Sequence, residues 1–547
     1  MTASPTRLGA RIDMTQPLLP GAPRLVAHWG APLRVLQADD AAQLQALLIE
    51  VEALARAGAW CVGGLRYEAA SALNDKLVTQ PAPGPLAWFG VYAAPGDAAP
   101  PPVAAAAATV QWQSGLARAG FDAAVQQIHQ DIADGRVYQV NLTHVLQGHS
   151  DAPVDGAALF GALQQAQPGG YALWADMGDE QVLSVSPELF FDWHQPANGS
   201  GDILTRPMKG TARRGATPAQ DAQQAEALRS SVKERAENVM IVDLLRNDLG
   251  QMAETGSVQV PQLFAVQALP SVWQMTSDVR ACLPQGTSLL ALLQALFPCG
   301  SITGAPKRSA MQVIAGLEAT PRGWYCGALG VVRPDGAGGV RATFNVPIRT
   351  VVLQGQQLQC GIGSGITADA QAAAEWQEWR YKRAFVERVS APFALLETLA
   401  LEDGQLRHQP WHLQRLAQAA QHFGYPVDAA QLQSALHALV QQHPQGLWRV
   451  RLQLQANGGL DVQAFACPAS PAQVRLQWAS APLAEAHGEF VRFKTTRRDH
   501  YERWAPHDAD VFDTLLWNEE GELTECTRGN IAALLDGRWT TPPLACG

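Results

Sequence analysis

The sequence predicts a mixed helix-and-sheet protein of two domains. Its 547 residues exceed the roughly 250–300 residues at which a single core usually stops growing. Phe121 to Asp134 has the periodicity of an amphipathic helix, and the next segment, YQVNLTHVLQ, alternates like a strand. The helical segment EWQEWRYKRAFVERV stops near Ser390, and a strand-like run, FALLETLAL, follows with its own turn at Asp403-Gly404. We therefore expect residues 391–547 to form a separate domain.

A second boundary is expected within the amino-terminal part of the chain. The segment from Pro95 to Ala108, PGDAAPPPVAAAAA, is rich in proline and alanine and is typical of a linker or long surface loop. The predicted organisation is thus an amino-terminal lobe with its linker over residues 1–110, a main domain over 111–390 and the carboxy-terminal domain over 391–547.

Composition excludes several classes of function. Apolar residues make up 47% of the chain and charged residues 16%, as in ordinary folded proteins. A net charge of -10 argues against nucleic acid as a partner. Neither a signal peptide nor a stretch of about 18 apolar residues is found, so we expect no membrane partner and a cytoplasmic location. The eight scattered cysteines lack zinc-ligand spacing and are predicted to be reduced core thiols.

Two pairs of glutamates are candidate metal ligands. Glu234 and Glu237 lie three residues apart in KERAENVMIVDLLRNDLG, and Glu375 and Glu378 have the same spacing in EWQEWRYK. This spacing places both carboxylates of a pair on one helix face. If the two pairs met, their oxygens would suit Mg²⁺, which takes a few carboxylates and keeps positions for water and substrate. Exposed helix faces are the more common explanation of such spacing taken alone.

Other polar residues lie in turns or beside buried strands. Lys209 follows a proline and precedes a glycine in RPMKGTARRG, and Glu188 precedes large apolar residues in SPELFF. A lysine acts as a nucleophile only when deprotonated, and burial raises the pKa of a carboxyl. FPCGSITGAPK departs from the Walker pattern, which argues against a nucleotide site. The glycines of GIGSGI, Gly361, Gly363 and Gly365, would let the backbone approach an anion closely.

Taken together, these segments resemble the chorismate-utilising enzymes, which include anthranilate synthase component I, aminodeoxychorismate synthase component I and the isochorismate and salicylate synthases. The resemblance covers residues 115–390 in the family's order. It is carried by SPELFF, RPMKGT, KERAENVMIVDLLRNDLG, FPCGSITGAPK, RGWYCGALG, NVPIRT, GIGSGITAD and EWQEWRYK. It implies an α+β fold in which antiparallel sheets pack with helices, with chorismate as the substrate.

The resemblance also implies roles for individual residues. Glu237 and Glu378 would be the nearer Mg²⁺ ligands, and Glu234 and Glu375 would hold the waters of the metal. The enolpyruvyl carboxylate of chorismate would meet two residues, and the ring carboxylate would meet a lysine and backbone amides. The residues implied for substrate binding are Tyr325 and Arg349 for the first carboxylate, and Lys382, Gly363 and the nearby Thr303 for the second.

Lys209 distinguishes members of this family. Aminodeoxychorismate synthases resemble PIKGT here, anthranilate synthases have alanine in place of the lysine, and this chain has PMKGT. The resemblance implies that Lys209 attacks C2 of chorismate while Glu188 protonates the departing C4 hydroxyl, after which ammonia at C4 displaces the lysine. Gln139 occupies the position where water-adding relatives have a lysine base, and Gln274 replaces a histidine found in many relatives.

Two features bear on partners and regulation. The chain has no GxCxG elbow of a glutamine amidotransferase, so we expect a separate amidotransferase subunit to supply ammonia. The segment GGLRYEAASAL is similar to the lobe that accommodates tryptophan in relatives; whether tryptophan binds here is left open.

The last part of the chain resembles the fold-type IV pyridoxal-phosphate enzymes, among them aminodeoxychorismate lyase. WHLQRL offers Arg415 for the cofactor phosphate, FKTTRRDHYERW offers Lys494 as the Schiff-base lysine, and LTECTRGNIA offers Glu525 opposite the pyridinium nitrogen. An acidic partner there makes the ring a better electron sink. The resemblance implies an α/β domain that releases pyruvate to give 4-aminobenzoate, a folate precursor. Because the chain ends at TTPPLACG, we expect this domain to be incomplete and its lyase activity and cofactor binding impaired.

The residues therefore favour a Mg²⁺-dependent aminodeoxychorismate synthase component I with a fused lyase-like domain. The alternative is an anthranilate synthase component I whose carboxy-terminal part is a non-catalytic interaction module. Lys209 argues against anthranilate synthase activity. The presence of Arg415, Lys494 and Glu525 argues against a non-catalytic carboxy-terminal module.

Overall fold

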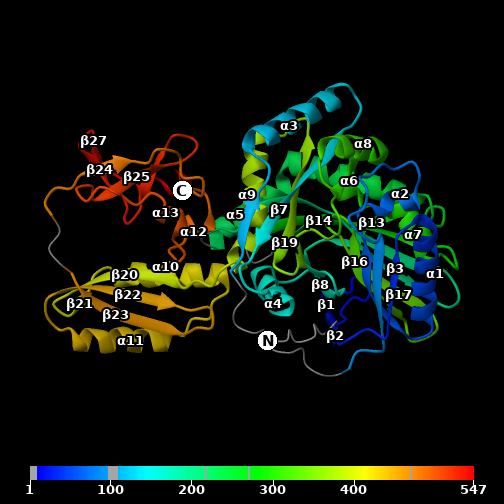
Figure 1. Cartoon of the computed structure of the whole chain (residues 1–547), viewed down its shortest axis with the longest axis horizontal. Helices are drawn as coiled ribbons and strands as arrows, with labels where there is room; N and C mark the ends of the chain where they lie inside the picture. Colours follow the sequence, from blue (N-terminus) through cyan, green and yellow to red (C-terminus); the bar gives the residue numbers. More distant parts are fainter. Residues whose placement is uncertain (1–8, 97–108, 216–217, 269–271, 468–470, 547) are drawn as a thin grey trace. The chain divides into compact units, whose positions relative to one another are not determined.

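The computed structural model covers the whole chain and describes residues 9–96, 109–215, 218–268, 272–467 and 471–546. The chain divides into two compact units, Met1–Ala391 and Pro392–Gly547 (Figure 1). Most of the predicted linker Pro95–Ala108 lies outside the described residues.

The first unit contains two large antiparallel sheets. One has the strand order β15-β7-β19-β18-β9-β8-β1-β2, with β6 also paired to β7. Its longest ladder joins β7 to β19 over eleven residue pairs, from Gln139↔Thr367 to His149↔Gln357. The strands are β1 (Ala10–Met14), β2 (Leu25–Trp29), β6 (Gln111–Ser114), β7 (Gln139–His149), β8 (Tyr171–Asp176), β9 (Gln181–Ser186), β15 (Gly304–Ala305), β18 (Thr350–Gln354) and β19 (Gln357–Thr367).

The second sheet has the order β12-β14-β11-β10-β17-β16-β4-β5-β3, with β13 also paired to β14. All of its pairings are antiparallel. The strands are β3 (Arg34–Ala38), β4 (Trp60–Leu65), β5 (Ala87–Tyr92), β10 (Leu189–Gln195), β11 (Gly201–Arg206), β12 (Met208–Arg213), β13 (Gln259–Ala268), β14 (Val272–Leu283), β16 (Ala328–Pro334) and β17 (Val340–Asn345).

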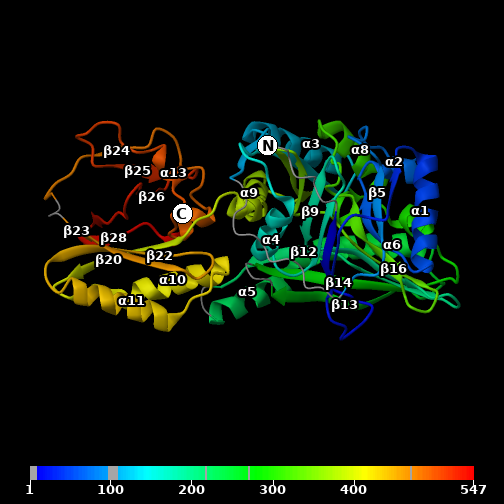
Figure 2. The same cartoon turned by 60° about the horizontal axis from the view of Figure 1, so that its bottom comes forward.

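The two sheets pack against each other, and helices cover their outer faces. Ile12 and Leu173 of the first sheet share a core with Trp88 and Leu329 of the second. Strands alternate their side chains between faces, so the opposite face of each sheet needs its own cover. Helices α1 (Ala41–Arg56), α2 (Ala69–Leu73), α6 (Val232–Gly250) and α7 (Leu289–Leu296) pack in one outer core, and α3 (Arg118–Ala133), α4 (Gly156–Ala166), α8 (Lys307–Leu317) and α9 (Ala372–Val389) pack in two others (Figure 2). A further helix, α5 (Pro218–Ser230), contacts β12, β13 and β14.

Several sequence predictions are confirmed here. The helix predicted over Phe121–Asp134 is α3, and the strand predicted after it is β7. The two ExxE segments lie on helices α6 and α9, as expected. The amino-terminal region does not stand apart, because β1 and β2 join the first sheet while β3, β4 and β5 join the second. The mixed helix-and-sheet class is confirmed.

The second unit begins with a four-stranded sheet, in the order β21-β20-β22-β23. Two helices pack on it, and Leu416 of α10 and Leu436 of α11 share a core with Leu395 and Leu452 of the sheet (Figure 2). A three-stranded sheet, β24-β25-β26, and a hairpin follow. The elements are β20 (Leu395–Glu402), β21 (Gln405–Leu406), α10 (Gln409–Phe423), α11 (Ala429–Gln442), β22 (Leu447–Leu454), β23 (Leu460–Ala466), β24 (Leu476–Trp478), α12 (Glu489–Arg492), α13 (Asp499–Glu502), β25 (Asp513–Trp517), β26 (Leu523–Cys526), β27 (Ala533–Leu535) and β28 (Arg538–Thr540).

All eight cysteines are free thiols. Six are buried, as predicted, but Cys282 and Cys467 are exposed, so the prediction of core thiols is wrong for those two. Cys282 lies near the end of β14 where alternate side chains face outward, and Cys467 directly follows β23. None of the helices in the described residues has the length and apolar character needed to cross a membrane.

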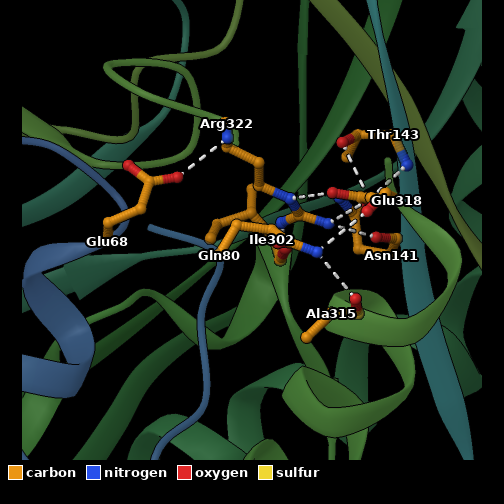
Figure 3. A network of polar contacts seen from close by, with 8 residues as sticks. All are labelled: Glu68, Gln80, Asn141, Thr143, Ile302, Ala315, Glu318 and Arg322. Carbon is orange, nitrogen blue, oxygen red and sulfur yellow. Dashed lines mark hydrogen bonds and ion pairs between the residues drawn. The ribbon is translucent and has the colours of Figure 1, made fainter. Parts of the chain in front are cut away.

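A buried ion pair joins several segments of the first unit (Figure 3). The guanidinium of Arg322 donates to both carboxylate oxygens of Glu318, at 2.8 and 2.7 Å, and to the carbonyls of Ile302 and Asn141, each at 2.7 Å. Glu318 also accepts from the backbone amide and hydroxyl of Thr143, both at 2.9 Å. Burial alone would lower the pKa of Arg322, but the Glu318 carboxylate raises it well above its ordinary value.

The same network extends to the amino-terminal region. Glu68, at the start of α2, accepts from the backbone amides of Arg322 at 2.8 Å and Gly323 at 3.2 Å. Gln80 donates to the carbonyl of Ala315 at 2.8 Å. The network therefore fixes the segment around Ile302, the strand β7 and the end of α8 against one another.

We expect Arg322→Met to destabilise the first unit by ~3–5 kcal/mol, because it leaves the Glu318 carboxylate buried without its cation. The shift of the urea unfolding midpoint measures this loss. Arg280→Met is the matched control, since Arg280 pairs with Asp202 at 3.0 Å on the surface and surface pairs contribute at most about 1 kcal/mol. Equal midpoints for the two variants would contradict a structural role for the network.

Candidate active site

The backbone around Lys209 is a strand, where the sequence predicted a turn, and two side-chain amides hold it. Lys209 lies in β12, and the following Gly210 has a φ of +93°, which glycine adopts without steric cost. Asn238 of α6 donates to the carbonyl of Lys209 at 3.4 Å, and Gln274 of β14 donates to that of Gly210 at 2.8 Å. Ser277 in turn orients the Asn238 amide through a 2.6 Å hydrogen bond. Gln274 therefore fixes the backbone beside Lys209.

The amine of Lys209 lies beside Gln139 and the glycine-rich strand β19. A Cβ atom at Gly365 would lie 2.8 Å from Lys209 Nζ and 2.4 Å from Gln139 Nε2. At Gly361 it would lie 2.2 Å from the ring of Tyr325, and at Gly363 2.5 Å from the carbonyl of Leu142. The glycines therefore make room for the protein's own side chains and backbone, where the sequence predicted room for an anion.

Glu188 is a buried carboxyl next to this lysine. It lies at the corner between β9 and β10 and is 3% exposed. Burial raises its pKa to about 7, although a hydrogen bond from Ser301 and the charge of Lys209 favour the ionised form. Its Oε1 has no hydrogen-bond partner among the described residues. Glu188 can therefore hold a proton near neutral pH and has one oxygen that no described residue engages.

Two further polar side chains near this site have unmet bonding capacity. Gln139 is fully buried, and neither its amide nitrogen nor its oxygen has a partner in the described parts of the chain. Arg349 has no carboxylate partner among the described residues; burial and the charge of Arg388 lower its pKa to about 10. Buried polar groups are normally hydrogen-bonded. Unpaired groups of this kind are expected where a polar ligand binds.

The other predicted substrate residues are placed as follows. Lys382 Nζ donates to the carbonyl of Gly363 at 2.8 Å and pairs with Glu378 at 2.6 Å. The Thr303 hydroxyl donates to the carbonyl of Cys299 or Gly300, each at 3.2 Å, in the loop that also carries Ser301. Lys382 and Gly363 therefore lie in contact, whereas the Thr303 hydroxyl is engaged by its own loop.

The four glutamates proposed for the metal lie on two helices that interact electrostatically. Burial, Glu237 and Glu378 together raise the pKa of Glu234, and burial with Glu378 raises that of Glu375. Glu375 Oε2 is buried without a partner in the described chain. Burial would raise the pKa of Glu378, but the Lys382 ammonium holds it below its usual value.

These carboxylates suit a hard divalent cation in their chemistry, since oxygen ligands and mutual repulsion both favour a Mg²⁺ ion. The four carboxylates are not close enough together to form a complete set of metal ligands. The described residues contain no group of three or more His, Cys, Asp or Glu side chains positioned to hold a metal. One of the four carboxylates, that of Glu378, is already neutralised by its ion pair with Lys382.

The second unit brings its three predicted residues into one electrostatic site. Burial and the charges of Arg415 and Arg498 lower the pKa of Lys494, while Glu397 and Glu525 oppose this. Glu525 accepts a 2.5 Å hydrogen bond from the Tyr501 hydroxyl. Arg415 binds Glu397 through Nε at 2.7 Å and Nη2 at 2.6 Å. An amine of lowered pKa, a cation and a carboxylate are the groups that a pyridoxal phosphate site requires.

Sequence reasoning missed several residues of these sites. Ser301 lies within FPCGSITGAPK, and Asn238 lies one residue after Glu237 in the helical ExxE segment, so both were inside motifs already chosen. Glu397 was detectable from another signal: it is a carboxylate on the apolar side of the alternating strand LLETLALE. Tyr501 likewise lies within FKTTRRDHYERW, the segment chosen for Lys494.

Comparison with protein families agrees with this geometry. Residues 28–388 match the family model for chorismate binding enzymes. Residues 394–547 match the amino-transferase class IV model. The second match covers the unit that contains Arg415, Lys494 and Glu525.

Individual relatives match the first unit. "Aminodeoxychorismate synthase component 1" of Salmonella typhimurium is 40% identical over 270 residues, which cover 49% of this chain and 57% of that protein. "Anthranilate synthase component 1 1" of Haloarcula marismortui is 37% identical over 307 residues, covering 56% of this chain and 60% of that protein. The matched region thus spans little more than half the length of these relatives.

Solved structures show the same fold. Anthranilate synthase component I from Streptococcus pneumoniae superimposes with a TM-score of 0.56 at 22% identity, over 70% of this chain and 93% of that one. The menaquinone-specific isochorismate synthase from Escherichia coli gives a TM-score of 0.55 at 20% identity, over 70% and 89% of the two chains. With a family model matched over more than half of its length, the chain belongs to the chorismate-binding enzyme family.

Proposed function

We propose that the first unit converts chorismate and ammonia into 4-amino-4-deoxychorismate. The observation that carries this proposal is the presence of Lys209 beside the buried carboxyl Glu188, whose pKa is raised to about 7. A nucleophilic amine next to a proton donor suits a substitution in which a hydroxyl group leaves. The curated relatives named aminodeoxychorismate synthase component 1 support the same activity.

The reaction would proceed in two displacements. The Lys209 amine forms a bond to C2 of chorismate as the C4 hydroxyl leaves, and Glu188 gives that hydroxyl its proton so that it departs as water. Ammonia then bonds to C4, the bond between C2 and Lys209 breaks, and the lysine amine is regenerated. Covalent catalysis of this kind replaces one difficult step by two easier ones.

Chorismate carries two carboxylates, and two cationic groups in the site have suitable chemistry for them. Arg349, with no carboxylate partner in the described chain, would bind the enolpyruvyl carboxylate together with Tyr325, and its planar fork matches a carboxylate. Lys382, which already contacts Gly363 at 2.8 Å, would bind near the ring carboxylate, with Thr303 nearby. Gln139 can orient a polar group of the substrate but cannot act as a base.

We infer that Mg²⁺ is held by Glu237 and Glu378, with Glu234 and Glu375 binding its waters. The ion would neutralise the ring carboxylate of the substrate. The mutual charge repulsion of Glu234 and Glu375 with Glu378 supports this assignment. Ammonia would come from a separate glutamine amidotransferase subunit, as the words "component 1" in the names of the relatives suggest.

For the second unit we propose pyridoxal phosphate as the cofactor and release of pyruvate from the product of the first unit. Lys494 would carry the cofactor and move a proton, Arg415 would bind its phosphate, and Glu525 would face the ring nitrogen. The cofactor supplies an electron sink. The lowered pKa of Lys494 supports this role, because a neutral amine is the reactive form.

We expect Lys209→Ala to lower the rate of aminodeoxychorismate formation by more than about thirtyfold, which corresponds to ~2 kcal/mol of barrier. The reaction is run with chorismate, Mg²⁺ and ammonium, and the products are identified by chromatography and mass spectrometry. Lys76→Ala, at an exposed loop position, is the control and should retain the parent rate. Near-parental synthesis by Lys209→Ala would exclude the covalent mechanism, and anthranilate as the main product of the parent would favour the rival activity.

The acid role of Glu188 predicts a pH dependence. Only the protonated carboxyl can donate, and its raised pKa keeps it protonated up to about pH 7. We therefore expect the ratio of kcat/KM in the parent to kcat/KM in Glu188→Gln to fall tenfold per pH unit above about 7, because the titration of the attacking amine is common to both proteins. Glu188→Gln should be slow and should lack this fall, because glutamine does not titrate. A constant ratio would assign the titration to another group.

The metal proposal predicts that Glu237→Gln and Glu378→Gln each raise the Mg²⁺ concentration for half-maximal activity at least tenfold, because an amide lacks the charge that holds a hard cation. Activity is measured against Mg²⁺ at saturating chorismate. Asp243→Asn is the matched control, since it removes a charge from the same helix at an exposed position paired with Arg246. Unchanged Mg²⁺ dependence in both glutamate variants would show that α6 and α9 present ordinary solvated carboxylates.

A further inference from the structure

A carboxylate in the second unit occupies a position that strand alternation assigns to apolar residues. In β20, Leu395, Glu397, Leu399 and Leu401 are buried while the residues between them are partly exposed. Leu395 packs with α10 and α11 in one core, and Leu399 with Leu439 of α11 in another. Glu397 is 1% exposed and lies on the same side of the strand. A buried charge at such a position is retained only where it is paired.

The partners of Glu397 all come from one face of α10. Arg415 donates through Nε at 2.7 Å and through Nη2 at 2.6 Å, and His412 contacts the same carboxylate through Nδ1 at 2.7 Å. Positions three apart share a helix face, so α10 closes over the carboxylate. The carboxylate binds only the Nε–Nη2 edge of the guanidinium, and no described residue bonds to Nη1. The Arg415 side chain is 46% exposed, so its other edge is accessible.

This ion pair lies directly beside Lys494. The backbone amide of Leu396, the neighbour of Glu397, donates to the carbonyl of Lys494 at 2.9 Å. Leu395 also forms a β-bridge to Thr495, the neighbour of Lys494. The strand that carries Glu397 is thus fixed to the segment that carries the reactive lysine.

We propose that Glu397 is a positioning residue: it holds Arg415 by the Nε–Nη2 edge so that the Nη1 edge is presented to the phosphate group of pyridoxal phosphate. The proposal rests on the proposed function of the second unit. In this proposal the buried carboxylate of Glu397 does not contact the phosphate and acts on it only by orienting Arg415.

Two effects of removing this carboxylate have opposite signs. Loss of a negative charge near the phosphate would tighten cofactor binding. Loss of the bidentate clamp would leave a long, flexible side chain that must be ordered when phosphate binds, and this would weaken binding. The clamp consists of two short charge-assisted hydrogen bonds, which are among the strongest in proteins, so we expect positioning to dominate.

The test compares pyridoxal phosphate with pyridoxal, which lacks the phosphate, on the full chain. Dissociation constants are measured by absorbance titration for the parent and for Glu397→Gln. We expect about tenfold weaker binding of pyridoxal phosphate, equivalent to ~1.4 kcal/mol, and pyridoxal affinity unchanged within twofold. Glu402→Gln is the matched control, because Glu402 lies on the same strand and pairs with an exposed arginine, Arg407. It should leave both constants unchanged.

Two more variants separate charge from position. Glu397→Asp keeps the charge but shortens the side chain, so positioning predicts weaker phosphate binding whereas a pure charge effect predicts parental binding. In an Arg415→Gln background, Glu397→Gln should have no further effect on the preference for the phosphorylated ligand. Glu397→Asp also serves as the test if Glu397→Gln does not fold.

The outcomes are distinct. Parental or tighter pyridoxal phosphate binding in Glu397→Gln or, where that variant does not fold, in Glu397→Asp would overturn the positioning role. An equal loss of both ligands would also overturn it, since that pattern belongs to a purely structural residue. A parent chain that binds neither ligand would refute the cofactor assignment of the second unit itself, together with the role of Glu397.

Discussion

The first unit depends on one buried ion pair, Arg322 with Glu318. The pair serves mainly to fix the arrangement of the segments that it joins. Its net contribution to stability is small compared with that of apolar residues in its place, because burying two charges carries a large desolvation cost. Its hydrogen bonds reach β7 at Asn141 and Thr143 and the loop at Ile302, and the register of β7 against β19 places Thr143 opposite Gly363. A single guanidinium thus ties the loop that carries Ser301 to β7, and β7 pairs with β19, the strand whose Gly363 contacts Lys382. We infer that specificity of arrangement is the gain that offsets the desolvation of this pair.

The site built on this frame has unused bonding capacity. Within the part of the chain that the structure describes, Glu188 and Glu375 each have a buried oxygen without a hydrogen-bond partner, and Gln139 has two such atoms. Each unsatisfied group costs about 1–3 kcal/mol in the absence of a ligand, so a chain without a polar ligand would gain stability by replacing them. A ring with two carboxylates and a hydroxyl, together with a cation and its waters, would satisfy acceptors and donors at once. The unpaired polar groups of the ligand-free site thus support the view that they are retained for binding and orienting a polar substrate.

The sequence predicted much of this arrangement because helices and strands have recognisable periods and the site residues lie within compact motifs. Helix α3 follows from its apolar periodicity, strand β7 from its β-branched alternation, and the two glutamate helices from their helical segments. What spacing could not predict is contact between distant segments. The role of Gln274 depends on the pairing of β12 with β14, and the glycines of β19 are explained only by Tyr325, Leu142 and Lys209 packing beside them. The role of the amino-terminal region in both sheets was likewise invisible, because its strands pair with segments more than a hundred residues away.

Burial gives two carboxyls in this chain different chemical characters. One oxygen of Glu188 has no partner among the described residues, and burial raises its pKa to about 7, so it can exchange a proton with a ligand. Glu525 is half-buried and burial raises its pKa too, but one of its oxygens accepts from Tyr501, and Arg498 and Lys494 favour its ionised form. Burial disfavours the ionised form of Glu525. A protonated ring nitrogen opposite this carboxylate would be a cation that favours ionisation. Ionisation of Glu525 and protonation of the ring would then stabilise each other, so in the proposed reactions Glu525 would stay ionised whereas Glu188 would donate a proton.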